Sequence, residues 1–329
     1  MNTVMCKHTH LMTPGGALNL QLLRLPPQTE KVVVVMGATG AGKSKLSIDL
    51  ATAFGGEIVN SDKIQVYKGL DIVTNKITEA EQRGVPHHLL GTVDPNSNFT
   101  AANFTKAASL AIKSISNRGR LPIIAGGSNS YIEALVESEN YECCFLWVDV
   151  SIPVLSSLVS DRVDRMMEAG MVDEVRKTFN PSSDYSRGIM TAIGVPEFDR
   201  YFRKEALLNE QARANLLGEV VDEVKRNNRK LARRQLEKIS RLRKVKGWKL
   251  HRLDATHVFR KQGREAEEVW ERMVAGPSFE IVSRFLRNVG PEGYGNNTAP
   301  VKRAVTAMCM QVMVIAAVRH WLLYSGSWV

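Results

Sequence analysis

The octapeptide GATGAGKS, residues 37–44, holds the residues of this sequence best suited to chemistry. It fits the pattern G-x-x-x-x-G-K-[ST], in which backbone N–H groups close around phosphate oxygens, the lysine adds a positive charge and the last hydroxyl can ligate Mg²⁺. The defined positions are Gly37, Gly42, Lys43 and Ser44. The octapeptide is therefore predicted to bind a phosphate-bearing ligand with Mg²⁺, and Ser44 is the predicted metal ligand.

The segments on both sides of this octapeptide suit a strand and a helix. Val32 to Met36 is a short, uncharged and mostly β-branched run, which is typical of a strand buried on both faces of a parallel sheet. Leu46, Leu50 and Phe54 then recur at helical spacing. A phosphate loop requires this order of strand, loop and helix, so the sequence predicts an α/β fold with a P-loop.

Polar residues follow two further predicted strands. Asp62 comes shortly after residues 57–59, and Ser128 and Asn129 follow residues 121–125. In an open α/β sheet such strand ends lie beside the phosphate loop, where substrates bind. Asp62 suits either a substrate contact or a helix cap, and the same two roles are open to Ser128 and Asn129.

Two more segments read as strands. Residues 145–150 carry Asp149, which suits either a Walker-B-like magnesium carboxylate or a structural role, because no other mark of an ATPase accompanies it. Residues 248–254 are predicted to return as a strand to the main sheet.

Composition limits the class of protein. A chain of 329 residues with 44% hydrophobic content can bury a substantial core, and we expect one large α/β domain with a smaller addition. The four cysteines show neither C-x-x-C spacing nor a disulfide framework. The sequence therefore favours a reducing compartment and argues against a metal held by cysteine.

The positive charge is concentrated in one segment. Residues 225–252 contain thirteen Lys or Arg and one acid, a net +12, which leaves −2 for the rest of a chain whose total is +10. A broken apolar stripe, Leu231, Leu236, Ile239 and Leu242, predicts a helix that rests on the core and turns its cations outward. Its partners would be the phosphates of a nucleotide or of RNA, or the segment is simply a solvated face.

Six segments together resemble the isopentenyltransferase (dimethylallyltransferase) family, and in particular its plant adenylate branch, which makes cytokinins. They are GATGAGKS, NSDKIQVYKGLDIVTNK, AGGSNSYIEALV, RVDRMMEAGMVDEV, AIGVPEF and KLARRQLEKI. The resemblance covers about residues 31–286. The resemblance implies a P-loop NTPase-like parallel sheet flanked by helices, with a smaller helical domain. It also implies that the loop binds the diphosphate of dimethylallyl diphosphate as a leaving group, and that the prenyl group moves to N6 of ATP, ADP or AMP.

The resemblance also assigns roles. It implies that Asp62 accepts the N6 proton, which favours the catalytic over the capping interpretation. It implies that Thr39 and Lys43 stabilise the departing diphosphate, with Mg²⁺ on Ser44. The rest of the loop, Ala38, Gly40 and Ala41, supplies backbone only.

Other residues match the family's phosphate- or acceptor-side positions. Thr74 and Lys76 fall where the family lines its nucleotide channel, although a surface loop is the alternative. Arg162 matches an arginine of R-V-x-x-M-x-x-x-G. The basic helix adds further candidates for phosphate contacts, namely Lys230, Arg233, Arg234 and Lys238.

Two other functions remain open at this point. A tRNA dimethylallyltransferase would use the same reaction centre on an anticodon-loop adenosine. Against it, only about 43 residues separate Val150 from Gly194, the chain lacks a C-x₂-C…H-x₃₋₅-H zinc-finger pattern, and the GGSNSYIEAL motif differs from the GGTGLY form of the tRNA branch. A P-loop small-molecule kinase is the second alternative, although a lid arginine cluster is not recognisable.

The expected organisation has five parts. Residues 1–30 form a leader that is acid-poor like a transit peptide, so plastid import is expected, with a disordered cytoplasmic leader as the alternative. Residues 31–150 form the P-loop core, 151–247 a helical domain with the basic helix, and 248–286 a return to the core. Residues 287–329 form a flexible linker and an apolar tail whose run 304–318 is too short to span a bilayer.

Overall fold

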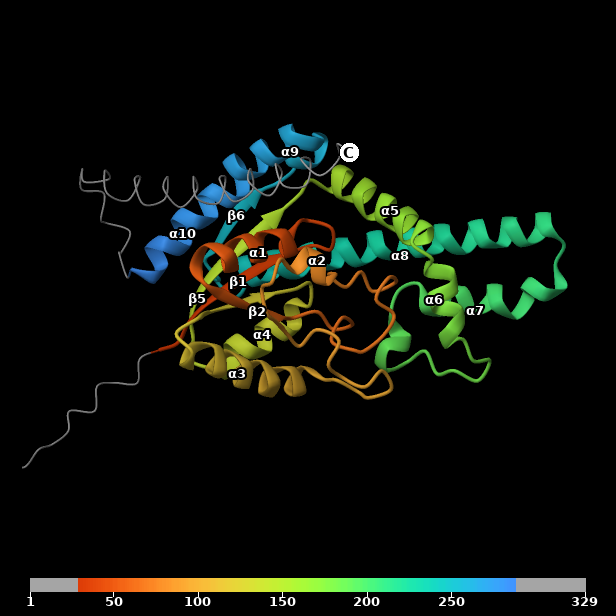
Figure 1. Ribbon diagram of the computed structural model, residues 1–329, viewed down its shortest axis with the longest axis horizontal. Coiled ribbons are helices and arrows are strands. Elements are labelled where there is room, and N and C mark those ends of the chain that lie inside the picture. The colour runs from red at the N-terminus through yellow and green to blue at the C-terminus, as the bar shows by residue number, and fades with distance from the viewer. Residues whose placement is uncertain (1–28, 288–329) are drawn as a thin grey trace, which may run out of the picture.

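A parallel sheet forms the centre of the protein. The structure is a computed structural model that describes residues 29–287 (Figure 1). In this part of the chain all strand pairs of the sheet are parallel and the strand order is β3-β2-β4-β1-β5-β6. The strands are β1 (Lys31–Gly37), β2 (Gly56–Asn60), β3 (His87–His88), β4 (Leu121–Ala125), β5 (Glu142–Asp149) and β6 (Leu250–Asp254).

The five strands predicted from the sequence are confirmed, and β3 is an addition. β3 has two residues, which is too short to produce a pattern in the sequence. The return of residues 248–254 to the sheet is also confirmed, because β6 pairs with β5 from Phe145 with Leu250 to Asp149 with Asp254.

Helices cover both faces of the sheet (Figure 1). They are α1 (Lys43–Phe54), α2 (Glu79–Gln82), α3 (Ala101–Asn117), α4 (Asn129–Ser138), α5 (Ile152–Glu168), α6 (Met171–Thr178), α7 (Val195–Lys204), α8 (Glu210–Lys244), α9 (Gly263–Trp270) and α10 (Gly276–Leu286). Short 3₁₀ segments lie at Gly188–Thr191, Glu205–Leu207 and Val258–Arg260, and a π-helical segment at Glu271–Ala275 joins α9 to α10.

Alternation along β1 explains how the two layers form. Val33 and Val35 join a cluster with residues of α1, α5, α9 and α10, whereas Val32, Val34 and Met36 join a cluster with α3, α4 and the end of α8. All five side chains are fully buried. Successive side chains of a strand point to opposite faces, so an uninterrupted apolar run is what a sheet covered on both faces requires.

A third hydrophobic cluster forms a smaller body beside the sheet. It contains residues of α5, α6, α7 and the first half of α8, with Phe198 fully buried among them. Residues Val66 to Val73, which precede this region by about 90 positions in the chain, also belong to the cluster. The smaller body is therefore built from two segments of the chain.

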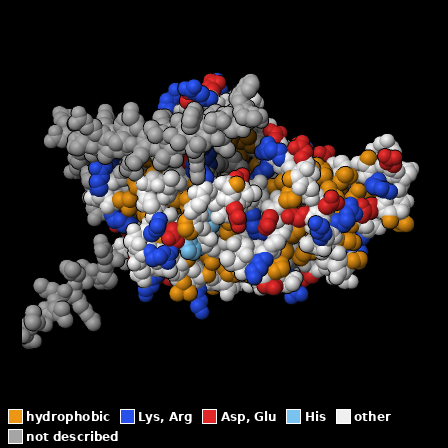
Figure 2. Space-filling model, viewed as in Figure 1, with side chains coloured by type: hydrophobic (Ala, Val, Ile, Leu, Met, Phe, Trp, Pro, Cys, Tyr) orange, Lys and Arg blue, Asp and Glu red, His pale blue; other side chains and the backbone are white. Residues whose placement is uncertain are grey.

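Helix α8 connects the two bodies, because its 35 residues reach from the smaller body to the sheet (Figure 1). Its buried positions are Val220, Val224, Asn228, Ala232, Gln235, Ile239 and Leu242, a stripe with spacings of three and four residues. The predicted stripe was wrong at Leu231, which is 36% exposed, because Ala232 holds the core position. Charged residues of both signs are mixed on the face seen in Figure 2, including the end of the molecule where α6, α7 and the start of α8 lie.

The predictions for most of the leader and for the tail lie outside the described residues, which begin at residue 29 and end at residue 287. Within that range, helices apolar and long enough to cross a membrane are absent.

Candidate active site

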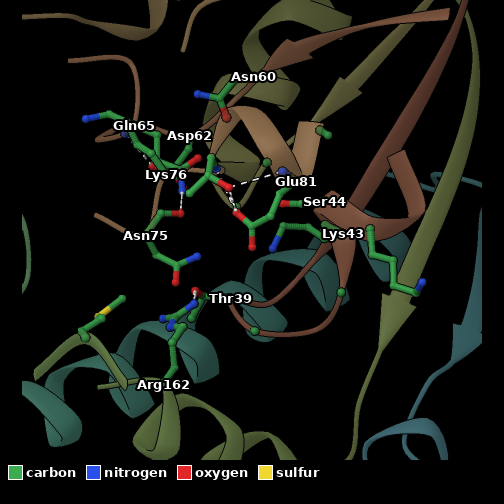
Figure 3. A pocket seen from close by; sticks show the side chains of 18 of the residues that line it. Thr39, Lys43, Ser44, Asn60, Asp62, Gln65, Asn75, Lys76, Glu81 and Arg162 are labelled. Atoms are coloured by element: carbon green, nitrogen blue, oxygen red, sulfur yellow. Dashed lines mark hydrogen bonds between the residues drawn. The ribbon is translucent and has the colours of Figure 1, made fainter. Parts of the chain in front are cut away.

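A cavity of about 590 Å³ lies at the carboxyl ends of β1, β2 and β4 (Figure 3). This is the edge where an open α/β sheet binds ligands. Its walls come from the phosphate loop, the loop after β2, residues 71–81, the loop after β4, and helix α5. Thr39, Gly40, Gly42, Lys43, Ser44 and Asp62 all line it, so residues predicted for the donor and for the acceptor share one space.

The phosphate loop needs its glycines because other parts of the protein pack against them. A Cβ atom at Gly37 would lie 2.5 Å from the carbonyl oxygen of Val148. Gly42 has a φ of +95°, and a Cβ there would lie 3.0 Å from two ring carbons of Trp270. Gly37, Ala38 and Ala41 do not line the cavity, and both alanines are buried in the core.

Lys43 lies on the first turn of α1, and its Nζ donates to the carbonyl oxygen of Ala38 at 2.8 Å. Burial lowers the pKa of Lys43 to about 8, and the neighbouring Asp62 carboxylate opposes this shift. The Ser44 hydroxyl points into the same region, and it makes no hydrogen bond to another described residue.

Arg162 of α5 reaches the phosphate loop from the helical body. Its guanidinium donates to Thr39 Oγ1 at 2.8 Å (Figure 3). It also donates to Asn228 Oδ1 at 3.1 Å. The Nε atom of Arg162 is buried without a hydrogen-bond partner in the described part of the chain. Burial lowers the pKa of this side chain to about 10, and the Asp62 carboxylate counteracts the shift. A cation with an unused donor therefore lies beside the loop.

Asp62 divides its two carboxylate oxygens between different tasks. Oδ1 accepts from the backbone N–H groups of Ile64 at 2.8 Å and Gln65 at 3.2 Å, so this oxygen caps a turn. The predicted helix cap was wrong in this respect, because in the described part of the chain no helix begins between β2 and α2. Oδ2 makes no hydrogen bond to any described residue, and Asp62 lines the cavity. Capping and proton transfer are therefore compatible in the same side chain.

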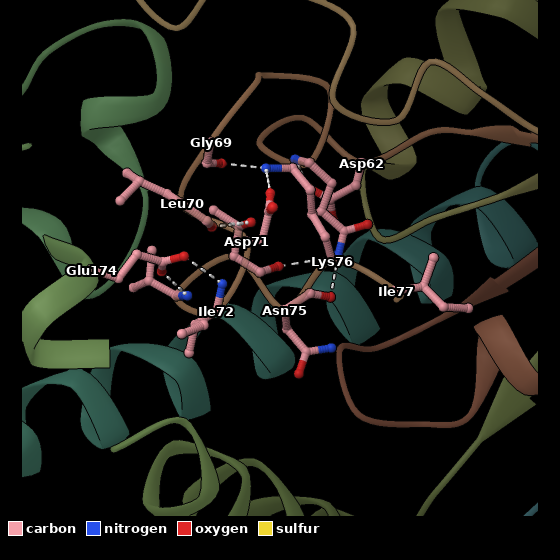
Figure 4. A network of polar contacts seen from close by, with 12 residues as sticks. Asp62, Gly69, Leu70, Asp71, Ile72, Asn75, Lys76, Ile77 and Glu174 are labelled. Carbon is pink, nitrogen blue, oxygen red and sulfur yellow. Dashed lines mark hydrogen bonds and ion pairs between the residues drawn. The ribbon is translucent and has the colours of Figure 1, made fainter. Parts of the chain in front are cut away.

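Part of the segment 69–76 lines one wall of the cavity, and side-chain contacts fix the course of this segment (Figure 4). Gln65 Nε2 donates to the carbonyl oxygens of Thr74 at 3.1 Å and Asn75 at 2.8 Å. Glu174 of α6 accepts from the backbone N–H groups of Ile72 at 2.9 Å and Val73 at 2.8 Å. The wall is thus held from the sheet side by an amide and from the helical body by a carboxylate.

The two residues predicted in this wall, Thr74 and Lys76, lie differently with respect to the cavity. Lys76 lines the cavity, but its Nζ is engaged by Asp71 Oδ1 at 2.8 Å and by the carbonyl oxygen of Gly69. Thr74 does not line the cavity, and its hydroxyl donates to the carbonyl oxygen of Leu70 at 2.6 Å. Both side chains shape the loop.

Other predicted residues also lie away from the cavity. Ser128 Oγ accepts from the backbone N–H of Lys63 at 2.8 Å, and Asn129 Nδ2 donates to the carbonyl oxygen of Gln235 at 3.1 Å. The structure favours the structural alternative for Asp149, because its carboxylate accepts from Arg252 at 2.7 Å outside the cavity. Four cations of α8 are likewise absent from the lining, namely Lys230, Arg233, Arg234 and Lys238.

Sequence reasoning missed several lining residues. Asn75, Glu81, Arg165, Met166 and Gln235 all face the cavity. Met166 has two roles, since it is 7% exposed in the smaller core and also lines the cavity. Its neighbours in the sequence offer no pattern that separates a lining methionine from a packing one.

A P-loop, a carboxylate and a buried arginine line one cavity, and these groups have the chemistry that suits a phosphate ester and a proton acceptor. A family model described as IPP transferase matches residues 65–140 and 136–241. The chain therefore belongs to the IPP transferase family, whose members are prenyl-transferring enzymes.

Similar proteins support this assignment. Adenylate isopentenyltransferase 3, chloroplastic, of Arabidopsis thaliana is 55% identical over 307 residues, which cover 88% of this chain and 91% of that protein. Adenylate isopentenyltransferase 5, chloroplastic, of the same plant is 59% identical over 266 residues, or 78% and 80% of the two chains.

Solved structures show the same fold. A eukaryotic dimethylallyltransferase acting on tRNA superposes with a TM-score of 0.69 at 23% identity, over 83% of this chain and 84% of that one. The tRNA isopentenylpyrophosphate transferase of Bacillus halodurans gives a TM-score of 0.63 at 26% identity, over 78% and 99%.

Proposed function

We propose that this protein transfers the dimethylallyl group of dimethylallyl diphosphate to N6 of a free adenine nucleotide, ATP, ADP or AMP, and releases diphosphate, the first step of cytokinin formation. The observation that carries the proposal is that Asp62 Oδ2, with no partner among the described residues, shares one cavity with Lys43 and the phosphate loop. A base and a diphosphate site on one cavity are what N-alkylation with a diphosphate leaving group requires.

The transfer forms one bond and breaks another at the same carbon. The N6 amine attacks C1 of the dimethylallyl group, the C1–O bond breaks, and its electron pair leaves with the diphosphate. Asp62 accepts the N6 proton, because the exocyclic amine is a weak nucleophile until that proton is removed. Lys43, Arg162 and the loop N–H groups stabilise the charge that builds on the departing oxygens.

The residues present fit Mg²⁺ bound through the substrate. Groups of three or more His, Cys, Asp or Glu side chains that could hold a metal are absent from the described residues. Mg²⁺ commonly takes only one or two protein oxygens and completes its coordination with phosphates and water. The Ser44 hydroxyl lines the cavity and makes no hydrogen bond to a described residue, so it would hold the ion. The ion would neutralise charge on the diphosphate.

The acceptor is the point where the two groups of similar proteins differ. The relatives named adenylate isopentenyltransferases are 55% and 59% identical to this chain, whereas the solved tRNA-modifying structures are 23% and 26% identical. The higher identity favours a free nucleotide. Membership of a prenyl-transferring family also argues against the kinase alternative.

Purified protein with Mg²⁺ and dimethylallyl diphosphate tests the acceptor directly. AMP, ADP, ATP and an unmodified tRNA anticodon stem-loop are supplied in separate reactions, and prenylated adenine is measured by mass spectrometry. We expect product from at least one free nucleotide. Product from the stem-loop alone would move this chain to the tRNA-modifying branch, and no product from any acceptor would contradict prenyl transfer itself.

We also propose that the protein acts in plastids, because the relatives at 55% and 59% identity are named chloroplastic. A relative at 56% identity is named mitochondrial, so the location of a full-length fluorescent fusion must be compared with markers of both organelles. Diffuse cytoplasmic fluorescence would contradict the proposal.

A further inference from the structure

Gln235 of α8 is a buried polar residue for which the proposed reaction so far has no role. It is 7% exposed and lines the cavity. Its Oε1 accepts from the backbone N–H of Thr39 at 2.7 Å, and its Nε2 donates to the carbonyl oxygen of Gly127 at 3.0 Å. Both ends of the amide are therefore occupied by backbone groups of two different loops.

One of those loops is the phosphate loop, where Thr39 is held from two helices. Gln235 of α8 accepts from its backbone N–H, and Arg162 of α5 donates to its hydroxyl at 2.8 Å. Because both contacts fall on one residue, the amide and the guanidinium together fix the third position of the phosphate loop.

The other loop, after β4, is joined to the segment that carries Asp62. The backbone N–H of Ser61 donates to the carbonyl oxygen of Ala125 at 2.8 Å, and Ser128 donates from its N–H to Ser61 and accepts at its Oγ from Lys63. These bonds bracket Asp62 on both sides. A shift of the loop after β4 would therefore move the carboxylate with it.

The backbone at residue 127 is adapted to the amide. A Cβ atom at Gly127 would lie 2.4 Å from Gln235 Nε2 and 3.6 Å from Asp62 Oδ2. Asn129 adds a third contact, since its Nδ2 donates to the carbonyl oxygen of Gln235 at 3.1 Å. Any side chain at residue 127 would displace the amide, whereas the carboxylate has room.

We propose that Gln235 is a positioning residue, whose amide fixes the separation between the phosphate loop that holds the donor and the Asp62 carboxylate that accepts the proton. This inference rests on the proposed prenyl transfer. Gln235 acts through Thr39 and Asp62, because its amide oxygen and one of its N–H groups bind backbone groups of the two loops that carry or adjoin these residues. Transfer requires the amine, C1 and the departing oxygen in line and the base within hydrogen-bond reach of the amine, and a misplacement of about 1 Å can cost about 100-fold in rate.

The variant Gln235→Met tests this role because methionine keeps the length of the side chain and removes both hydrogen bonds. The matched control is Gln211→Met, which makes the same change at the distal end of α8, where the Gln211 amide is exposed and donates to Asn215 Oδ1. We expect Gln235→Met to lower kcat by about 10- to 100-fold. The Kd of dimethylallyl diphosphate, measured by calorimetry, should stay within about threefold, and the control should match the wild type.

A double-mutant cycle with Asp62→Asn separates positioning from general support of the fold. If Gln235 acts by placing the base, adding Gln235→Met to the Asp62→Asn variant should lower the kcat of that variant by less than about threefold. Equal fold-losses in both backgrounds would overturn the inference, as would a kcat of Gln235→Met within about twofold of the wild type. Loss of donor binding in proportion to kcat would overturn it too.

A second variant covers the case in which Gln235→Met fails to fold. Gly127→Ala places a methyl group 2.4 Å from the amide nitrogen of Gln235, which must then move, so the variant should reproduce the loss of kcat. Wild-type kcat in Gly127→Ala would overturn the inference. The inference depends on the proposed function, which an inactive wild type would refute. An active wild type together with a variant of unchanged kcat would refute the inference alone.

Discussion

Donor binding should carry a pH dependence that originates at Lys43. Burial lowers the pKa of its ammonium to about 8, so in the ligand-free protein the charge is lost as the pH rises through 8. A bound diphosphate next to Nζ favours the protonated form and raises that pKa again. Binding above pH 8 should therefore take up a proton from the solvent.

The size of the effect follows from the titration. In the ligand-free protein the Lys43 side chain is protonated in about nine-tenths of the molecules at pH 7 and in about one quarter at pH 8.5. Binding should therefore take up roughly 0.1 proton at pH 7 and roughly 0.75 proton at pH 8.5. Between pH 8 and 9 the Kd of the donor should rise by about fivefold. Arg162, with a pKa of about 10, stays charged in this interval.

Calorimetry in buffers of different ionisation enthalpy measures the proton uptake directly. Titration of dimethylallyl diphosphate at pH 7 and 8.5 gives the number of protons from the dependence of the apparent enthalpy on the buffer. Lys43→Arg is the control, because arginine remains protonated throughout and should show no uptake at either pH. An uptake at pH 8.5 no larger than that at pH 7 in the wild type would refute the assignment to Lys43.

Two further predictions concern the walls of the cavity. Gly42→Ala should abolish donor binding and lower the free energy of unfolding by more than Gly55→Ala does. Both glycines have a positive φ, but only a Cβ at residue 42 would meet Trp270. Denaturant unfolding of both variants tests this, and equal losses of unfolding free energy would contradict it. Glu174→Met removes both acceptors that hold the wall at residues 72 and 73, so it should raise the acceptor KM about tenfold and leave the donor Kd unchanged. An unchanged acceptor KM would show that this wall does not bind the acceptor.

The sequence predicted those parts of the site that depend on neighbouring residues. The phosphate loop has a fixed spacing, and Asp62 follows a strand whose end must lie near that loop in a parallel sheet. The cap formed by Asp62 is also local, since the two N–H groups that donate to it belong to residues two and three positions ahead. Such features follow from spacing alone.

Contacts between distant segments could not be predicted in the same way. Gln235 is 196 residues from Thr39, and Glu174 is about 100 residues from the wall that it holds. A glutamine in a basic helix and a glutamate in an amphipathic one look like ordinary surface residues until the fold places them. The error at Leu231 has a similar cause, because a helical stripe shifted by one residue fits the sequence about as well.

Asp62→Asn tests the central claim most directly. Asparagine keeps an oxygen at Oδ1 for the N–H groups of Ile64 and Gln65, so the cap survives while the proton acceptor is lost. With donor prebound and adenine nucleotide added, we expect single-turnover prenyl transfer to slow by about 100- to 10,000-fold, with donor Kd and thermal stability unchanged. Transfer at the wild-type rate would show that this carboxylate is only a cap and that the proton leaves by another route.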